Sequence, residues 1–271
     1  MAGTEALRAH LLRERLAGSL ATDREKTLRR YRLFAAGDPR TLMGCEPERR
    51  WEVAELAELV ARRCGGPTGI ERYGGPAVID PVRTLAGLRQ LSAALAEVAS
   101  RRAPVLLGTG HPDRLLGFYA GLSVALSAVG CPVLTPGYGR RLALTTRFGV
   151  RPHVLVYVRG VAFVREQDVR TTHDRPGAHT HSPLPLRVAL AAAAEADGVL
   201  PQLVIGDHGW ACGAGQLGFP VAATADVDDP AVFVAQGEGR VSTVVPLDDG
   251  VSAASYQPLV RYVLKQARLS H

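Results

Sequence analysis

Lysine is almost absent from this chain of 271 residues, where Lys26 and Lys265 are the only two lysines among 32 basic residues. Aromatic residues are scarce as well, at 6%. Nucleic-acid-binding surfaces combine clustered basic residues with aromatic side chains that stack on bases. The formal net charge of +6 is distributed differently, with 18 basic and 13 acidic residues in 1–103 but 4 and 7 in 199–271. We expect no nucleic-acid polymer as a partner, and the acidic C-terminal third beside an arginine-rich remainder suits a metal and phosphate site or a domain interface.

Long apolar runs are also missing. No stretch approaches the roughly 18 residues of a membrane span, and the N-terminus MAGTEALRAHLLRERL carries charges on a helical period where a signal peptide has a continuous apolar segment. The sequence therefore predicts a cytoplasmic protein with no membrane partner. The four cysteines form no CxxC pair, which disfavours a zinc ribbon or a disulfide framework. The hydrophobic content of 46% is enough for a sizeable core.

The first 80 residues predict a helical N-terminal cap packed on the rest of the chain. Residues 4–36 are typical of two helices, and Asp23 or Thr22 can cap the second of them. Residues 51–63 predict a short helix between loops rich in glycine and proline. Arg24 lies near a helix N-terminus, where anions are favoured, and is a candidate phosphate contact. The alternative for the basic residues of this helix is a solvated surface.

Residues 81–271 predict a Rossmann-like α/β core, in which a mostly parallel sheet lies between two layers of helices. After a long helix, strand 104–107, helix 115–129 and strand 131–135 read as a βαβ unit. The further predicted elements are a hairpin over 154–164, a helix over 186–196, strands at 203–205, 220–224 and 240–245, and a closing helix over 256–268. We expect the three-layer core and the cap packed on it to form one structural unit.

The turn GTGHPD follows the first core strand. It lacks the third glycine of the dinucleotide fingerprint, and no acidic residue ends the second strand, which disfavours NAD binding. Backbone amides of residues 108–111 at a helix N-terminus can still hold a phosphate. The candidate phosphate-binding residues of this turn are Thr109, Gly110 and His111.

The segment TTHDRPGAHTHSPLP, residues 171–185, concentrates polar side chains of catalytic types. Two imidazoles separated by one residue lie on the same side of an extended strand, which is a common metal-ligand spacing. Loops on a rigid scaffold often carry function, and the alternative is a polar surface loop. The residues concerned are His173, Asp174, His179, His181 and Ser182. We assign His181 to a metal, and His179 and Ser182 to a phosphate group.

The stretch LVIGDHGWACGAG places a carboxylate and an imidazole directly after an apolar strand. In open α/β sheets, ligands bind beyond the carboxyl ends of parallel strands. Asp207 and His208 are therefore candidate catalytic residues, and the glycine-rich turn after them allows close approach to a ligand. Asp207 can alternatively act as a covalent nucleophile. The simpler alternative is a strand-to-helix turn with a capping aspartate.

Two later strands also end in carboxylates, in the segments ADVDDP and PLDDG. If the strands are parallel, all these groups meet at one edge of the sheet. Carboxylates with one or two imidazoles suit Mg²⁺, Mn²⁺, Fe²⁺ or Zn²⁺, with water as the nucleophile. The candidate metal ligands from these two segments are Asp229, Asp248 and Asp249. With arginines and turn amides nearby, a phosphate ester is the matching substrate.

The blocks GTGHPDRLL, HTHSPLP, DHGWACGAGQLG, ADVDDPAVF and VPLDD, with ATDREKTLRRY near the N-terminus, resemble a family of actinobacterial proteins known simply as phosphatases. The resemblance runs through nearly the whole chain and implies phosphomonoester hydrolysis at the residues named above. The chain departs from the family pattern at Asp113-Arg114 and at Pro183, where glycines are expected, and this weighs against a phosphate cradle in the first turn. GTGHP and GDHGWACGAG also resemble glutamate-cyclase-like proteins, which implies a metal-assisted lyase or cyclase.

Three functions follow from these patterns. The first and favoured one is a metal-dependent phosphatase that hydrolyses a small phosphomonoester, such as a sugar phosphate, a nucleoside phosphate or a natural-product intermediate. The second is a Rossmann-like lyase or cyclase that acts on a small carboxylic acid. The third is a non-enzymatic ligand-binding module. The expected partners are a divalent metal ion and a small phosphorylated metabolite, and a homodimer is left open.

Overall fold

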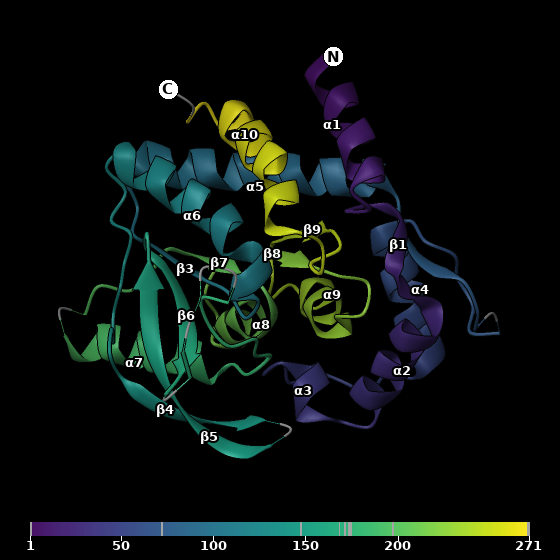
Figure 1. Cartoon of the computed structure of the whole chain (residues 1–271), viewed down its shortest axis with the longest axis horizontal. Helices are drawn as coiled ribbons and strands as arrows, with labels where there is room; N and C mark the ends of the chain where they lie inside the picture. Colours follow the sequence, from purple (N-terminus) through teal and green to yellow (C-terminus); the bar gives the residue numbers. More distant parts are fainter. Residues whose placement is uncertain are drawn as a thin grey trace.

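A computed structural model describes residues 2–71, 73–146, 148–167, 169–170, 172, 175–196 and 198–269, so His173 and Asp174 lie outside the described residues. The structure confirms the predicted α/β class, with a seven-stranded, mostly parallel sheet flanked by helices (Figure 1). The helices are α1 (Ala2–Arg13), α2 (Arg24–Ala35), α3 (Pro39–Leu42), α4 (Val53–Cys64), α5 (Pro81–Arg101), α6 (Pro112–Ala128), α7 (Leu184–Glu195), α8 (His208–Gln216), α9 (Pro230–Gly237) and α10 (Gln257–Gln266), with a 3₁₀ turn at Ala253–Tyr256. The strands are β1 (Gly18–Asp23), β2 (Pro76–Ile79), β3 (Val105–Gly108), β4 (Arg141–Thr146), β5 (Gly149–Val158), β6 (Val161–Glu166), β7 (Leu203–Gly206), β8 (Val221–Ala225) and β9 (Thr243–Pro246).

The large sheet has the strand order β4-β5-β6-β3-β7-β8-β9. From β6 to β9 every neighbouring pair is parallel, whereas β4, β5 and β6 form an antiparallel meander. Every residue of β3, β7, β8 and β9 is buried, as expected for parallel strands that are covered on both faces. Gly108 pairs with Gly206, which pairs with Ala223, so β3 and β7 end level with each other, while β8 and β9 continue to the pair Ala225 and Pro246. Their carboxyl ends therefore form one edge of the sheet.

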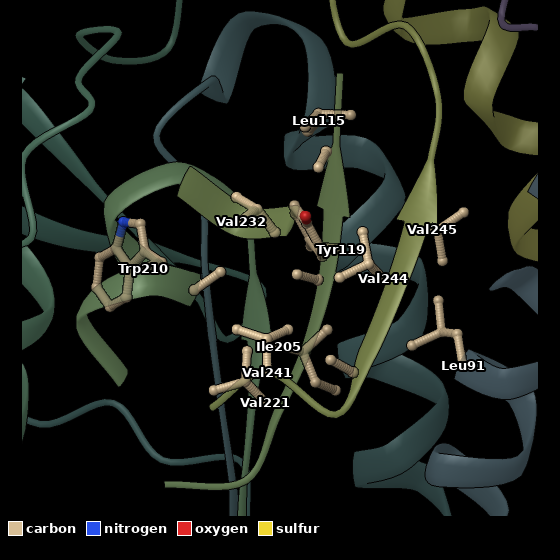
Figure 2. Packing of buried hydrophobic residues seen from close by; sticks show 14 of the residues in the cluster. Leu91, Leu115, Tyr119, Ile205, Trp210, Val221, Val232, Val241, Val244 and Val245 are labelled. Carbon is tan, nitrogen blue, oxygen red and sulfur yellow. The ribbon is translucent and has the colours of Figure 1, made fainter. Parts of the chain in front are cut away.

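Helices cover both faces of this sheet, which confirms the predicted three layers. Helices α5, α6 and α10 pack together on one face, and α7, α8 and α9 pack together on the other (Figure 1). In Figure 2, Leu91 of α5 and Trp210 of α8 lie on opposite sides of the strands that carry Ile205 and Val221. Over the described part of the chain, no helix combines the length and the apolarity needed to cross a bilayer.

The N-terminal part of the chain contains the predicted helices and, in addition, two strands that the sequence did not predict. Residues Gly18–Asp23 form β1, which pairs antiparallel with β2. Both strands are short and alternate buried with more exposed positions, a pattern too brief to outweigh the neighbouring helical signals. Asp23 caps α2 as predicted, and its carboxylate accepts the amide of Lys26 at 2.6 Å.

Long-range hydrogen bonds join this N-terminal part to the loops at the carboxyl edge of the sheet. The hydroxyl of Tyr31 donates to the carbonyl of Val227 at 2.8 Å, and the amide of Asp248 donates to the carbonyl of Leu16 at 3.0 Å. Tyr31 is buried, so its hydrogen bond fixes α2 against the loop after β8. The division of the chain at residue 80 into a cap and a core stays a prediction.

Two local expectations for the core were wrong. Residues 131–135 make only a single parallel bridge, between Val105 and Val133, and Pro132 and Pro136 remove donors that a strand would need. The segment after Asp207 forms the helix α8 from His208 onwards, where a glycine-rich turn was expected. Glycine is required at 209 for a different reason, since a Cβ there would lie 2.3 Å from the carbonyl oxygen of Ser182. Gly209 thus lets the loop before α7 pack directly on α8.

Replacing Gly108 with alanine is expected to destabilise the fold, because a Cβ there would lie 2.2 Å from Cδ2 of the buried Trp210. Overpacking of this kind costs about 1–3 kcal/mol, which urea unfolding measures as a loss in the free energy of unfolding. Gly74→Ala is the matched control, since its Cβ would meet nothing within 4 Å, and we expect it to stay within about 0.5 kcal/mol of the wild type. Equal stability of the two variants would contradict the close packing of β3 on α8.

Candidate active site

Side chains from six stretches of the chain line one cavity of about 250 Å³ at the carboxyl edge of the sheet. Four of these stretches directly follow β3, β7, β8 and β9, and the other two are the start of α2 and the loop before α7. The strand directions predicted this convergence. Thr22 and Gly250 border the cavity, and its remaining lining consists of Lys26, Arg30, His111, His179, His181, His208, Asp226, Asp228, Asp229, Asp248 and Asp249.

His208 contacts both the carboxylates and the imidazoles of the cavity. It is the first residue of α8, and its backbone φ of 44° lies in the left-handed region, a strained conformation that is concentrated at functional sites. Its Nε2 lies 3.2 Å from Asp229 Oδ2 and 3.1 Å from Asp249 Oδ2. Burial opposes protonation of the ring, but the charges of Asp229 and Asp207 outweigh it and raise the pKa of His208 well above the usual value.

Three further imidazoles surround His208. The Nε2 atoms of His179 and His181 are 3.1 Å apart, His111 stacks on His179 with ring centroids 4.1 Å apart, and His181 stacks on His208 at 4.3 Å. Burial of the rings and repulsion from His208 lower the pKa of His179 to about 2 and that of His181 to about 3. Both rings are therefore neutral at physiological pH, which is the form that binds a metal.

The five carboxylates of the cavity differ in their ionisation. Burial raises the pKa of Asp226, Asp228 and Asp248, and repulsion from neighbouring carboxylates adds to the effect. Burial also opposes the charge of Asp229 and Asp249, but contacts with protonated imidazoles outweigh it and lower the pKa of both groups. The cavity thus contains a dense set of carboxylates that only partly find cationic partners.

Three sets of these side chains place their ligand atoms within 4.8 Å of one another, close enough to share one cation. The sets are the imidazole group (His179, His181 and His208), the mixed group (His208, Asp229 and Asp249) and the carboxylate group (Asp226, Asp248 and Asp249). Asp248 is 3% exposed, and within the described residues its Oδ2 atom has no hydrogen-bond partner. A buried carboxylate oxygen without a partner is costly, and a bound cation would satisfy it. The donor set therefore fits a divalent metal ion.

Two cations of α2 border the cavity, and the sequence patterns did not single them out. Lys26 Nζ lies 2.9 Å from Asp228 Oδ2. Arg30 Nη2 lies 2.9 Å from His181 Nδ1 and 3.5 Å from Asp229 Oδ1, and its Nε donates to the carbonyl of Asp228 at 3.3 Å. These residues looked like part of a solvated basic surface. Their spacing of four residues, which places both on one side of a helix, was the available signal.

The polar groups of the first turn, where a phosphate cradle was predicted, make hydrogen bonds within the protein. The Thr109 hydroxyl donates to Asp207 Oδ2 at 2.6 Å, and the Gly110 amide donates to Asp207 Oδ1 at 2.5 Å. The amide of Thr109 donates to the carbonyl of Ala162, and that of His111 donates to the Thr109 hydroxyl. Only His111 of this turn lines the cavity, at least within the described residues. Asp207 itself, 1% exposed, lies behind His208 with both carboxylate oxygens engaged.

Arg24 and Ser182 also lie outside the described lining of the cavity, contrary to expectation. The Arg24 guanidinium donates to the carbonyls of Pro67 and Gly69, because α2 turns this side chain toward the loop before β2. The Ser182 hydroxyl accepts the amide of Leu184 at 3.2 Å, at the start of α7, which is a typical use of serine beside a helix N-terminus. The positive charges near the cavity come from Lys26 and Arg30 in place of Arg24.

Fold and site together define a class: an α/β protein whose parallel strands end at a cavity of histidines and aspartates suited to a divalent cation. The family model described as Phosphatase matches residues 2–271. Phosphatase SCO2771 from Streptomyces coelicolor is 36% identical over 265 residues, which cover 97% of this chain and 95% of that protein. The chain belongs to the Phosphatase family, which confirms the predicted resemblance and supports phosphatase activity. No solved structure matches the chain.

Asp207 and Thr109 are expected to be energetically coupled, because their hydrogen bond is fully buried. Asp207→Ala leaves the Thr109 hydroxyl and the Gly110 amide without an acceptor, at a cost of about 2–4 kcal/mol. Thr109→Val removes one of these donors, so the double variant should be more stable than additivity predicts by about 1–2 kcal/mol. Urea unfolding of the two single variants and the double variant measures the coupling. Strict additivity would show that Asp207 does not anchor this turn.

Proposed function

We propose that this protein is a metal-dependent phosphatase that hydrolyses a small phosphomonoester, such as a sugar or nucleoside phosphate. The observation that carries the proposal is the cavity at the carboxyl edge of the sheet, where four imidazoles and five carboxylates face two cationic side chains in about 250 Å³. Phosphoryl transfer needs opposite charge around the phosphate and an oriented water molecule, and this lining can supply both. Membership of the Phosphatase family supports the same reaction class.

The proposed metal ligands are His179, His181, His208, Asp229, Asp248 and Asp249, all of which lie in the three ligand sets. The neutral rings of His179 and His181 favour this role, as does the unpartnered Oδ2 of Asp248. At His208, whose pKa is raised by Asp229 and Asp207, a cation would take the place of the proton. A divalent cation held there would lower the pKa of an attacking water and neutralise charge on the phosphate oxygens. These residues would then act by positioning charge and by excluding other orientations of the water.

Lys26 and Arg30 are the proposed phosphate-binding cations. Arg30 is 19% exposed in its side chain and lies between the imidazoles and Asp229, so its guanidinium can reach an anion in the cavity. A guanidinium can donate hydrogen bonds to two phosphate oxygens at once, and these hydrogen bonds become stronger as negative charge develops on the oxygens. Lys26, now paired with Asp228, adds a second positive charge on the same side.

His111 is the proposed proton donor to the leaving-group oxygen. Its Nδ1 lies 3.5 Å from Asp249 Oδ2 and its Nε2 lies 3.5 Å from Asp113 Oδ1. Burial disfavours the charged ring, but the contact with Asp249 outweighs burial and raises the pKa of His111. This favours the protonated form, which a general acid requires before the reaction.

We infer that Asp207 is a positioning residue rather than a nucleophile. Its carboxylate accepts hydrogen bonds from Thr109 and Gly110, and Oδ1 lies 3.4 Å from Nδ1 of His208. A nucleophile needs a free oxygen at the substrate, whereas this arrangement orients the His208 ring in the manner of a carboxylate behind a metal-bound histidine. Of this segment, we therefore propose that His208 alone lines the reaction centre, where it acts as a metal ligand.

Removal of divalent metal is expected to abolish phosphate release from a panel of small phosphate esters. EDTA treatment should reduce the rate at least about 100-fold, and Mn²⁺, Mg²⁺, Zn²⁺ or Fe²⁺ should restore it.

Asp249→Asn should reduce kcat/KM at least about 100-fold, since it removes a ligand. Asp80→Asn is the matched control, because Asn caps α5 as well as Asp does, and its activity should be unchanged. Activity that survives complete chelation would contradict metal dependence, and conversion of a carboxylic acid without any phosphate release would favour the lyase or cyclase alternative.

Arg30→Ala is expected to weaken phosphate binding, because it removes a charge-assisted contact worth about 1.5–3 kcal/mol. This corresponds to a loss of about 10- to 150-fold in kcat/KM, and Arg30→Lys should recover part of it. Arg29→Ala, the exposed neighbour on α2, is the control and should match the wild type. Competitive inhibition by inorganic phosphate gives a second readout, and the inhibition constant should rise in parallel. Unchanged phosphate inhibition in Arg30→Ala would remove this residue from the site.

A further inference from the structure

The three ligand sets overlap in a way that limits how many cations they can hold. The imidazole group and the mixed group share His208. Its Nδ1 faces Asp207 at 3.4 Å, so Nε2, 3.1 Å from Asp249 Oδ2, is the ring nitrogen turned toward the carboxylates. One ring nitrogen offers one lone pair. These two groups therefore serve a single cation between them.

The carboxylate group is separate from the imidazoles and meets the mixed group only at Asp249. A carboxylate has two oxygens with several lone pairs, so Asp249 can bind two cations at once. Asp226 and Asp248 are 2% and 3% exposed, and in the described structure Oδ2 of Asp248 is a buried acceptor without a donor. That unpartnered atom is an observation independent of the clustering, and it favours a cation-binding position beside Asp248.

The excess of carboxylates favours more than one cation. Five carboxylates line the described cavity, and apart from the imidazoles its cationic side chains are Lys26 and Arg30. Two divalent cations offset more of this negative charge than one does, and so they favour the approach of an anionic phosphate ester.

We propose that the cavity holds two divalent cations that share Asp249. This rests on the proposed function for its substrate, but the number of cations is measurable without any substrate. The first cation takes the imidazole group together with Asp229 and Asp249, and the second takes Asp226, Asp248 and Asp249. Asp228 belongs to neither set, because its carboxylate pairs with Lys26.

The two positions differ in ligand chemistry. Imidazole nitrogens suit Zn²⁺ and other transition metals, whereas a site of carboxylate oxygens suits Mg²⁺ or Mn²⁺. The first position should therefore retain a transition metal through purification. The second should exchange readily with Mg²⁺ or Mn²⁺ from the buffer. Mixed occupancy by two different metals is the expected resting composition of the purified protein.

The test is the binding of Mn²⁺ to the full chain after chelation, followed by titration calorimetry and by metal analysis of the dialysed protein. The wild type should bind two Mn²⁺ per chain. Asp226→Asn should lose the weaker site and keep the tighter one, and His181→Ala should do the reverse, each with a loss of at least about 10-fold in affinity at the affected site. Asp80→Asn should bind as the wild type does. Circular dichroism of each variant checks that the fold is retained.

The electron paramagnetic resonance spectrum of the wild type gives a measurement that needs no variant. Two Mn²⁺ ions that share a carboxylate couple magnetically, so the hyperfine pattern of isolated Mn²⁺ should be lost on addition of the second equivalent. Binding of a single Mn²⁺ per chain, or a spectrum that only grows in intensity, would overturn the proposal. Two bound cations without hydrolysis of any ester would contradict the proposed function alone, whereas hydrolysis with a single bound cation would contradict this inference alone.

Discussion

Mutual repulsion among five carboxylates, four of them buried and Asp249 partly buried, is the constraint on which the arrangement of this protein depends. Burial and repulsion raise the pKa of Asp226 well above the usual value, and in the described structure the cationic side chains and protonated imidazoles near these groups are Lys26, Arg30, His111 and His208. Such a cluster is costly in the absence of a ligand. The cost of holding these carboxylates together at the ends of four parallel strands is recovered if a cation binds among them. The unpartnered oxygen of Asp248 is consistent with that account.

The scaffold holds these groups in place from behind. Asp207 anchors the turn after β3 and faces His208, and Gly209 permits the loop that carries His181 to pack on α8. The N-terminal part completes the site, because α2 supplies both cations and the hydroxyl of Tyr31 binds the backbone of the loop after β8. The cavity is therefore a joint product of the sheet and of α2, and neither part alone contains the full set of charges.

Much of the core was predictable because its signals are local. The sequence marks three strands as apolar runs, each followed at its carboxyl end by acidic residues: Asp207, DVDDP and PLDDG. Because these strands are parallel, the acidic ends meet at one edge of the sheet. The roles of Arg24, Arg30 and Thr109 were not predictable in this way. Which side of α2 faces the cavity, and whether a turn amide is already hydrogen-bonded, depend on contacts between residues far apart in the sequence, and β1 and β2 were too short to produce a periodic signal.

The X-ray absorption spectrum of the Zn²⁺-loaded protein tests the central claim most directly. If the imidazoles and carboxylates of this cavity bind the metal, the first shell should contain nitrogen and oxygen at about 2.0–2.2 Å, with the outer-shell scattering of imidazole rings. That imidazole scattering should weaken in His181→Ala. A spectrum of the hydrated ion, with no imidazole contribution in the wild type, would contradict the account.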